Sequence, residues 1–157
     1  MSAQLIYDLV PLGSIVTYRD GTPRSPERHR KKLAAWENRN SGGRLIRKQA
    51  ETRVGNTTLP ASITLHKCDY GSQGTIVLRV HQSFSVNSDL NFAVKERPAI
   101  GSVLMLDDGE DAELVYLASH RADAEEWLTR HGYPRAVLQE VTADAVAADT
   151  VEGSAAA

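Results

Sequence analysis

The sequence predicts an α+β fold, in which a mainly antiparallel sheet of about six to eight strands is covered by two helices. Short runs of alternating apolar and polar residues recur between turn residues, whereas apolar residues at helical spacing occur in two segments. With 157 residues, of which 41% are hydrophobic, the chain can bury one sizeable core. We therefore expect a single domain over residues 1–141 and a flexible, acidic and Ala-rich tail over 142–157.

The first elements are a strand and a helix. Residues 14–19 contain four consecutive β-forming residues followed by the turn sequence Asp-Gly-Thr-Pro, which predicts a short strand. Ser25 can cap a helix whose first position is Pro26, and this helix should run to about Asn38. Its docking face is predicted from an apolar stripe at helical spacing, His29, Leu33 and Trp36.

A hairpin is the clearest β signal in the chain. The turn-forming residues 40–43 should end the helix, and 44–59 is interpreted as a short strand leading into a mobile basic loop. Residues 61–66 and 76–81 then alternate in polarity on either side of the turn residues 69–74, which predicts a hairpin with one buried face. The expected buried positions on its second strand are Ile76, Leu78 and Val80.

The C-terminal part is predicted to be a strand-helix-strand unit. Apolar residues at helical spacing indicate a helix that Ser119 caps and Gly132 ends, and residues 136–141 resume as a strand. Three further strands are expected before this helix, over 90–94, 102–106 and 113–118.

Charge is distributed unevenly along the chain. Residues 19–53 contain eleven Lys or Arg against four acidic residues, although the formal net charge of the whole chain is -2. A local basic surface is enough to attract nucleic-acid phosphates, and Tyr18 or Trp36 could stack on an unpaired base, unless Trp36 is instead a core anchor. The predicted nucleic-acid-binding residues are Arg24, Arg28, Lys31, Lys32, Arg39, Arg44, Arg47, Lys48 and Arg53.

The acidic segment 107–126 gives the alternative hypothesis. It holds eight carboxylates against the single cation Arg121, so it could mimic a phosphate surface and bind a nucleic-acid-processing protein, or simply be a soluble turn. Its spacing does not match a calcium loop. The alternative protein-binding residues are Asp107, Asp108, Glu110, Asp111 and Glu113.

Catalytic and metal-binding motifs are lacking. No pair of the five histidines has zinc-ligand spacing, no nucleophile elbow or phosphate loop is present, and the one cysteine, Cys68, has no evident base.

A cytoplasmic location is expected, because the chain has a single cysteine, no secretory signal and no apolar run long enough to span a bilayer. We expect a small non-enzymatic protein, without metal or cofactor, that contacts nucleic acid mainly through its phosphates.

Overall fold

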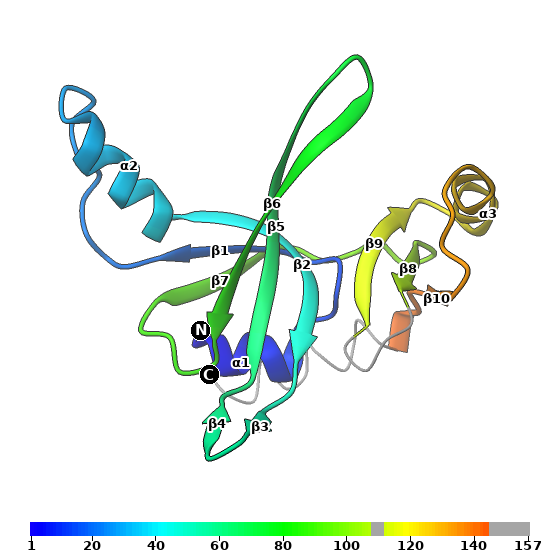
Figure 1. Ribbon diagram of the computed structural model, residues 1–157, viewed down its shortest axis with the longest axis horizontal. Coiled ribbons are helices and arrows are strands. Elements are labelled where there is room, and N and C mark those ends of the chain that lie inside the picture. The colour runs from blue at the N-terminus through cyan, green and yellow to red at the C-terminus, as the bar shows by residue number, and fades with distance from the viewer. Residues whose placement is uncertain (108–111, 145–157) are drawn as a thin grey trace.

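The α+β prediction is confirmed. The computed structural model describes residues 1–107 and 112–144, and within these ranges three helices accompany ten strands in antiparallel sheets of five, three and two strands (Figure 1). Among these residues, no helix has the length and low polarity that crossing a membrane would require. In chain order the elements are α1 (Ala3–Leu9), β1 (Ile15–Arg19), α2 (Arg30–Arg39), β2 (Ser41–Gln49), β3 (Thr52–Val54), β4 (Thr57–Leu59), β5 (Ser62–Ser72), β6 (Thr75–Ser85), β7 (Asn91–Glu96), β8 (Val103–Asp107), β9 (Glu113–Ala118), α3 (Arg121–Arg130) and β10 (Ala136–Glu140).

The main sheet has the strand order β6-β5-β2-β1-β7, and α1 covers one of its faces (Figure 1). The side chain of Ser2 caps α1 by accepting a hydrogen bond from the backbone of Leu5, and Ala3, Ile6 and Val10 place their side chains in the core. Their spacing of three and four residues gives α1 one apolar face. We did not predict this helix from the sequence, although its capping residue and apolar spacing are both present there.

The helix ends at Arg39, close to its predicted end, and a strand follows as expected, but the predictions of a turn through residues 41–43 and of a loop before Leu59 are wrong. Gly42 and Gly43 lie inside β2, which pairs with β1 on one side and β5 on the other. A Cβ atom at Gly43 would come within 2.5 Å of the backbone oxygen of His66, so the two glycines permit close strand pairing instead of ending a helix. The segment expected to be a mobile loop is the end of β2 and the small β3–β4 hairpin.

The predicted hairpin of β5 and β6 is present, but it is longer than expected and projects beyond the sheet (Figure 1). Gln73 and Gly74 both have positive φ, 52° and 79°, which suits a two-residue turn. The expected burial of the second strand is wrong at its outer end, because Ile76 is 49% and Leu78 is 56% exposed. A β-bulge at Val77 also places Ile76 and Leu78 on opposite faces of the hairpin.

The C-terminal strand-helix-strand unit is confirmed. Its sheet has the order β10-β8-β9, and α3 packs on β8 and β9 through Ala124 and Trp127. The cap of α3 is His120 instead of Ser119, and the helix ends at Arg130, before Gly132. Apolar residues of β2, β8, β9 and Val141 join the two sheets. Of the predicted tail, residues 145–157 lie outside the described residues.

Candidate nucleic-acid interface

Helix α2 projects from the main sheet as an arm, and none of its residues is buried (Figure 1). The predicted start at Ser25 and Pro26 is wrong. The carbonyl of Pro26 accepts a hydrogen bond of 3.0 Å from His29 N–H, which closes an isolated turn, and α2 begins only at Arg30. We call residues 23–39 the α2 arm.

The apolar stripe of the α2 arm does not dock into the core, contrary to the prediction. His29 is exposed, and Leu33 and Trp36 are half-buried. The Trp36 indole donates a hydrogen bond of 3.0 Å to the carbonyl oxygen of Thr22, which fixes the orientation of the ring. Trp36 is therefore not the core anchor that its spacing from Leu33 indicated.

A pocket of about 510 Å³ lies where the α2 arm meets β1, and the Trp36 side chain forms part of its lining. Arg19 and Ser41 line it from the two neighbouring strands, β1 and β2. An aromatic side chain and a cation thus border the same concave surface. Trp36 could be identified from the sequence as a candidate stacking face, but this pocket could not, because it forms only where β1, β2 and α2 meet.

Polar contacts fix the base of the α2 arm to the sheet. The Asp20 carboxylate accepts hydrogen bonds from the Thr22 backbone (3.0 Å) and hydroxyl (2.6 Å), from the Asn40 amide (3.0 Å) and from Arg39 Nε (3.2 Å). These bonds, those from Thr22 above all, hold the pKa of Asp20 well below its ordinary value. Arg39 also forms an ion pair of 3.3 Å with Asp89. Arg39 therefore orients the arm, with its charge shared between two carboxylates.

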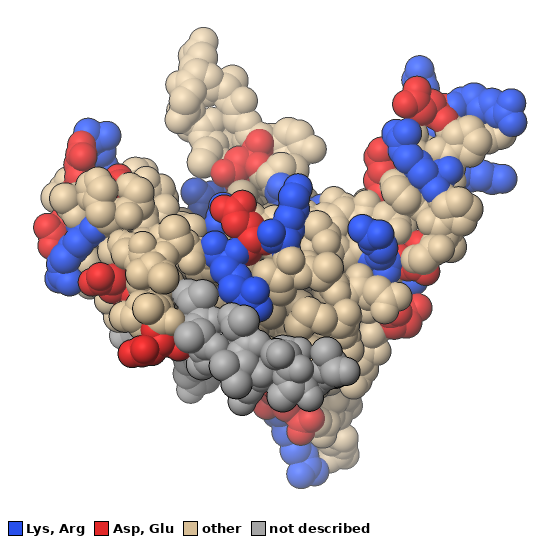
Figure 2. All heavy atoms as spheres, turned by 180° about the vertical axis from the view of Figure 1, so that it is seen from behind, with Lys and Arg blue, Asp and Glu red and all other residues tan. Residues whose placement is uncertain are grey.

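The remaining cations of the α2 arm are exposed. Arg24 forms an ion pair of 3.7 Å with Glu27. The Arg28 side chain donates only to the neighbouring His29 ring, at 3.2 Å, and Lys31 has no carboxylate within ion-pair distance among the described residues. Lys32 is likewise without such a partner there and precedes Trp36 by four residues, so the two are neighbours on the helix surface. Figure 2 shows Lys and Arg side chains gathered over this arm.

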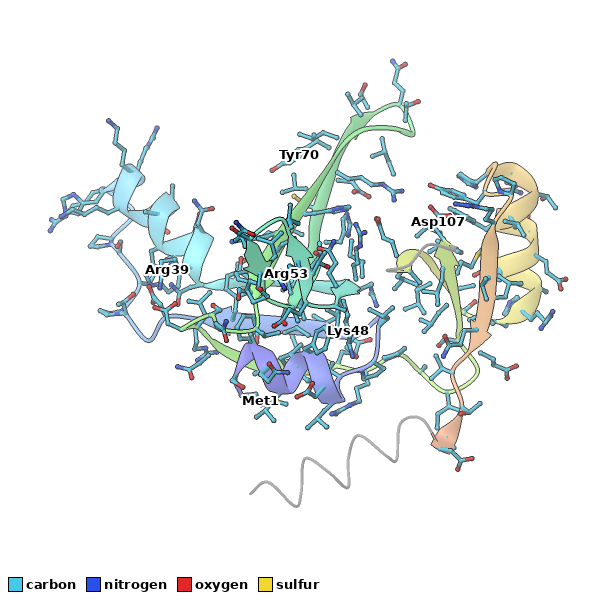
Figure 3. The ribbon with its side chains drawn as sticks, turned by 60° about the horizontal axis from the view of Figure 1, so that its bottom comes forward. Met1, Arg39, Lys48, Arg53, Tyr70 and Asp107 are labelled. Atoms are coloured by element: carbon cyan, nitrogen blue, oxygen red, sulfur yellow. The ribbon has the colours of Figure 1, made fainter. Side chains whose placement is uncertain are left out.

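The structure places the other predicted cations elsewhere. Arg44 lies on β2 and donates a hydrogen bond of 2.6 Å to the carbonyl of Gly13. Arg47 and Lys48 are half-buried on the same strand, and Arg53 lies on the β3–β4 hairpin. Figure 3 shows Lys48 and Arg53 well away from Arg39. Five of the nine predicted residues therefore lie on the α2 arm, which also carries Trp36 of the pocket, and the other four lie on β2 and the β3–β4 hairpin.

Tyr18 is not available as a stacking face. It is 2% exposed, its ring packs on Phe84 and Phe92, and its hydroxyl donates to Gln82 at 2.9 Å. Lys67 Nζ donates to the same hydroxyl at 2.7 Å. Tyr18 is therefore a core residue whose polar end is satisfied within the sheet.

The acidic segment is described only in part. Asp107 is exposed at the end of β8, Glu113 is half-buried on β9, and the other three predicted protein-binding residues, Asp108, Glu110 and Asp111, lie outside the described residues. Two of the acids of α3 pair with arginines of the same helix, Glu125 with Arg121 at 3.2 Å and Glu126 with Arg130 at 2.6 Å. These pairs reduce the negative charge that this part of the chain can offer a partner.

Metal-binding chemistry finds no support in the described part of the chain, where no three His, Cys, Asp or Glu side chains are arranged to hold an ion.

In comparisons with known proteins, no curated protein and no solved structure matches the chain. One family model, described as "Uncharacterised conserved protein UCP036055", matches residues 1–145. The chain therefore belongs to this family.

Proposed function

We propose that the protein is a non-enzymatic, single-strand nucleic-acid-binding protein whose interface is the α2 arm. Arg28, Lys31 and Lys32 would contact phosphates, and Trp36 would stack on one unpaired base. The observation that carries the proposal is that α2 stands away from the sheet, buries no residue and presents cations without carboxylate partners in the described structure. Electrostatic contacts of this kind are independent of base sequence.

The contribution of α2 to folding supports this proposal. A helix of ten residues is marginal in water by itself and normally depends on packing of an apolar face. Here polar contacts at its C-terminal end, including those of Arg39 and Asn40 with Asp20, hold the helix instead. The exposed cations therefore have no part in the core, and changing them should leave the fold intact.

The pocket at Trp36 makes a single strand a better ligand than a duplex. An unpaired base can reach an aromatic side chain in a concave site, whereas a base within a duplex keeps both faces stacked on its neighbours. The hydrogen bond from the Trp36 indole to Thr22 holds the ring in place before a ligand arrives. Arg19, at the edge of the same pocket, can contact an adjacent phosphate.

Fluorescence anisotropy with labelled oligo-dT and oligo-U tests the proposal. Three phosphate contacts predict a log-log salt dependence of magnitude about 2 on a single strand. Replacing Arg28, Lys31 and Lys32 together by Glu should weaken binding and flatten that dependence, with an unchanged thermal midpoint.

A matched control separates local contact from net charge. Replacing Arg53, Lys95 and Arg135 by Glu makes the same charge change at three exposed positions outside the α2 arm. This control should keep an affinity near that of the wild type. Equal losses in both variants, or no binding by the wild type even in low salt, would exclude the α2 arm as the interface and leave the acidic protein-binding surface as the alternative.

A further inference from the structure

A groove of about 430 Å³ lies between the two larger sheets, on the face of the main sheet opposite α1. Strands β2, β5 and β6 form one wall, and β9 with α3 forms the other. Its volume lies within the range of small-molecule sites, roughly 300–1,000 Å³. The groove is separate from the Trp36 pocket, with which it shares no lining residue.

The wall formed by the main sheet carries an ordered polar cluster. His66 Nε2 and Asp69 Oδ1 lie 2.6 Å apart, and Arg79 Nε lies 3.8 Å from the same Asp69 oxygen. The His81 ring packs edge-on against that of His66, with 5.6 Å between centroids. The His66 hydrogen bond is the main cause of a lowered pKa of Asp69. The carboxylate therefore stays charged and holds both side chains in position.

The charges on this wall do not balance. Asp69 is the only carboxylate among its lining residues, and it serves both His66 and Arg79. Arg44 lines the same wall and donates a hydrogen bond to the neutral carbonyl of Gly13. Two guanidinium groups thus face one carboxylate. The opposite wall contributes Glu113, which disfavours a ligand with several negative charges.

The rest of the groove is apolar. Tyr116 and Trp127 stack in parallel on the second wall, with ring centroids 4.9 Å apart, and Leu117 lies beside them in the lining. From the first wall Ile76 contributes an aliphatic side chain that is 49% exposed. An apolar ligand that covers this side chain would remove it from water.

We propose that this groove binds a small organic anion with one negative charge and an apolar body. Arg79, Arg44 and the two imidazoles hold the anionic group, and Ile76, Leu117 and the Tyr116–Trp127 pair contact the body. The β-bulge at Val77 contributes to this arrangement, because it turns Ile76 to the same face of the hairpin as Arg79.

Isothermal titration calorimetry with octanoate, which carries one carboxylate on an apolar chain, tests this site. We expect one octanoate per chain, and neither octylamine nor inorganic phosphate should compete, since each has only one of the two required features. Arg79→Met keeps the aliphatic part of the side chain and removes its charge. This variant should bind octanoate about tenfold more weakly or worse, as expected for a hydrogen bond to a charged group.

Two control variants test whether the loss of any cation, or of any exposed apolar side chain on this hairpin, would weaken octanoate binding. Lys95→Met removes one exposed cation elsewhere, and Leu78→Ser removes an exposed apolar side chain from the opposite face of the same hairpin. Both should bind octanoate as the wild type does. The proposal is overturned if octanoate does not bind at millimolar concentration, if Arg79→Met binds as tightly as the wild type, or if Leu78→Ser abolishes binding. Reversal of the α2 arm charges should not affect octanoate, so this site and the nucleic-acid interface can fail independently.

Discussion

Replacing Trp36 by Ala should weaken nucleic-acid binding far more than it weakens the fold. Removal of a fully buried aromatic side chain costs about 3–5 kcal/mol of unfolding free energy. Trp36 is only half-buried, no residue of α2 is buried, and the hydrogen bond from the Trp36 indole to Thr22 contributes about 1 kcal/mol. We therefore expect the unfolding free energy to fall by less than about 2 kcal/mol.

Trp36→Ala should reduce the affinity for nucleic acid by a larger fraction than it reduces the unfolding free energy. Stacking of one base on an aromatic side chain contributes about 1–3 kcal/mol, which corresponds to an increase in Kd of about 5- to 150-fold. Urea unfolding followed by far-ultraviolet circular dichroism measures stability, and anisotropy with oligo-dT measures affinity. Trp36→Phe keeps an aromatic face without the indole N–H, so it should recover most of the affinity.

Phe92→Ala supplies the calibration for a core residue. Phe92 is 2% exposed and packs on Tyr18 and Phe84, so its replacement should cost about 3–5 kcal/mol. If Trp36→Ala is as destabilising as Phe92→Ala, Trp36 is a folding anchor. If Trp36→Ala leaves the oligo-dT affinity unchanged, Trp36 does not stack on a base. Either result refutes the role assigned to it here.

Two further predictions concern the fold around this site. Hydrogen bonds, those from Thr22 above all, lower the pKa of the Asp20 carboxyl group. A carboxylate of this kind stabilises the fold fully above its ordinary pKa of 3.8, and this stabilisation is lost as the pH falls below that value. The thermal midpoint of Asp20→Asn should therefore lie below that of the wild type at neutral pH and approach it in strong acid, whereas a constant difference would contradict a role for the charge. Gly43→Ala would place Cβ 2.5 Å from the His66 backbone oxygen and should cost about 1–3 kcal/mol, whereas Gly132→Ala, with nothing within 4 Å, should be nearly neutral in the same thermal scan. Equal midpoints of the two glycine variants would contradict the close pairing of β2 with β5.

Elements with strong local patterns could be predicted from the sequence. Alternation identified the base of the β5–β6 hairpin, a run of β-forming residues before a turn identified β1, and helical spacing identified α3. The predictions failed where a long-range contact decides the local structure. Gly42 and Gly43 resemble a helix stop, but the neighbouring strands require their lack of a side chain. The bulge at Val77 likewise shifts an alternation that appears regular in the sequence.

The site could be predicted only in its charge. The positions of Lys31 and Lys32 on a helix followed from spacing, whereas Arg28 lies in the turn that precedes α2 and not on the helix. That the apolar stripe stays outside the core did not follow from spacing, because periodicity shows that a helix is two-sided and not whether a sheet covers it. The cations of β2 appeared to continue the same surface only because their strand was interpreted as a loop. Grooves built from five elements leave no local signal, so the His66–Asp69 pair could not be located either.

The pairing of β1 with β7 also determines when the chain can fold. These strands are adjacent in the sheet, but the whole segment from α2 to β6 separates them in sequence, and Phe92 of β7 completes the core beneath α1. Contacts between such distant segments form slowly, because the intervening chain loses conformational entropy on loop closure before any contact compensates for that loss. During synthesis β1 keeps an open edge until residues 91–96 have left the ribosome. A fragment that ends before residue 91 should therefore remain unfolded and prone to aggregate, however complete its other strands are.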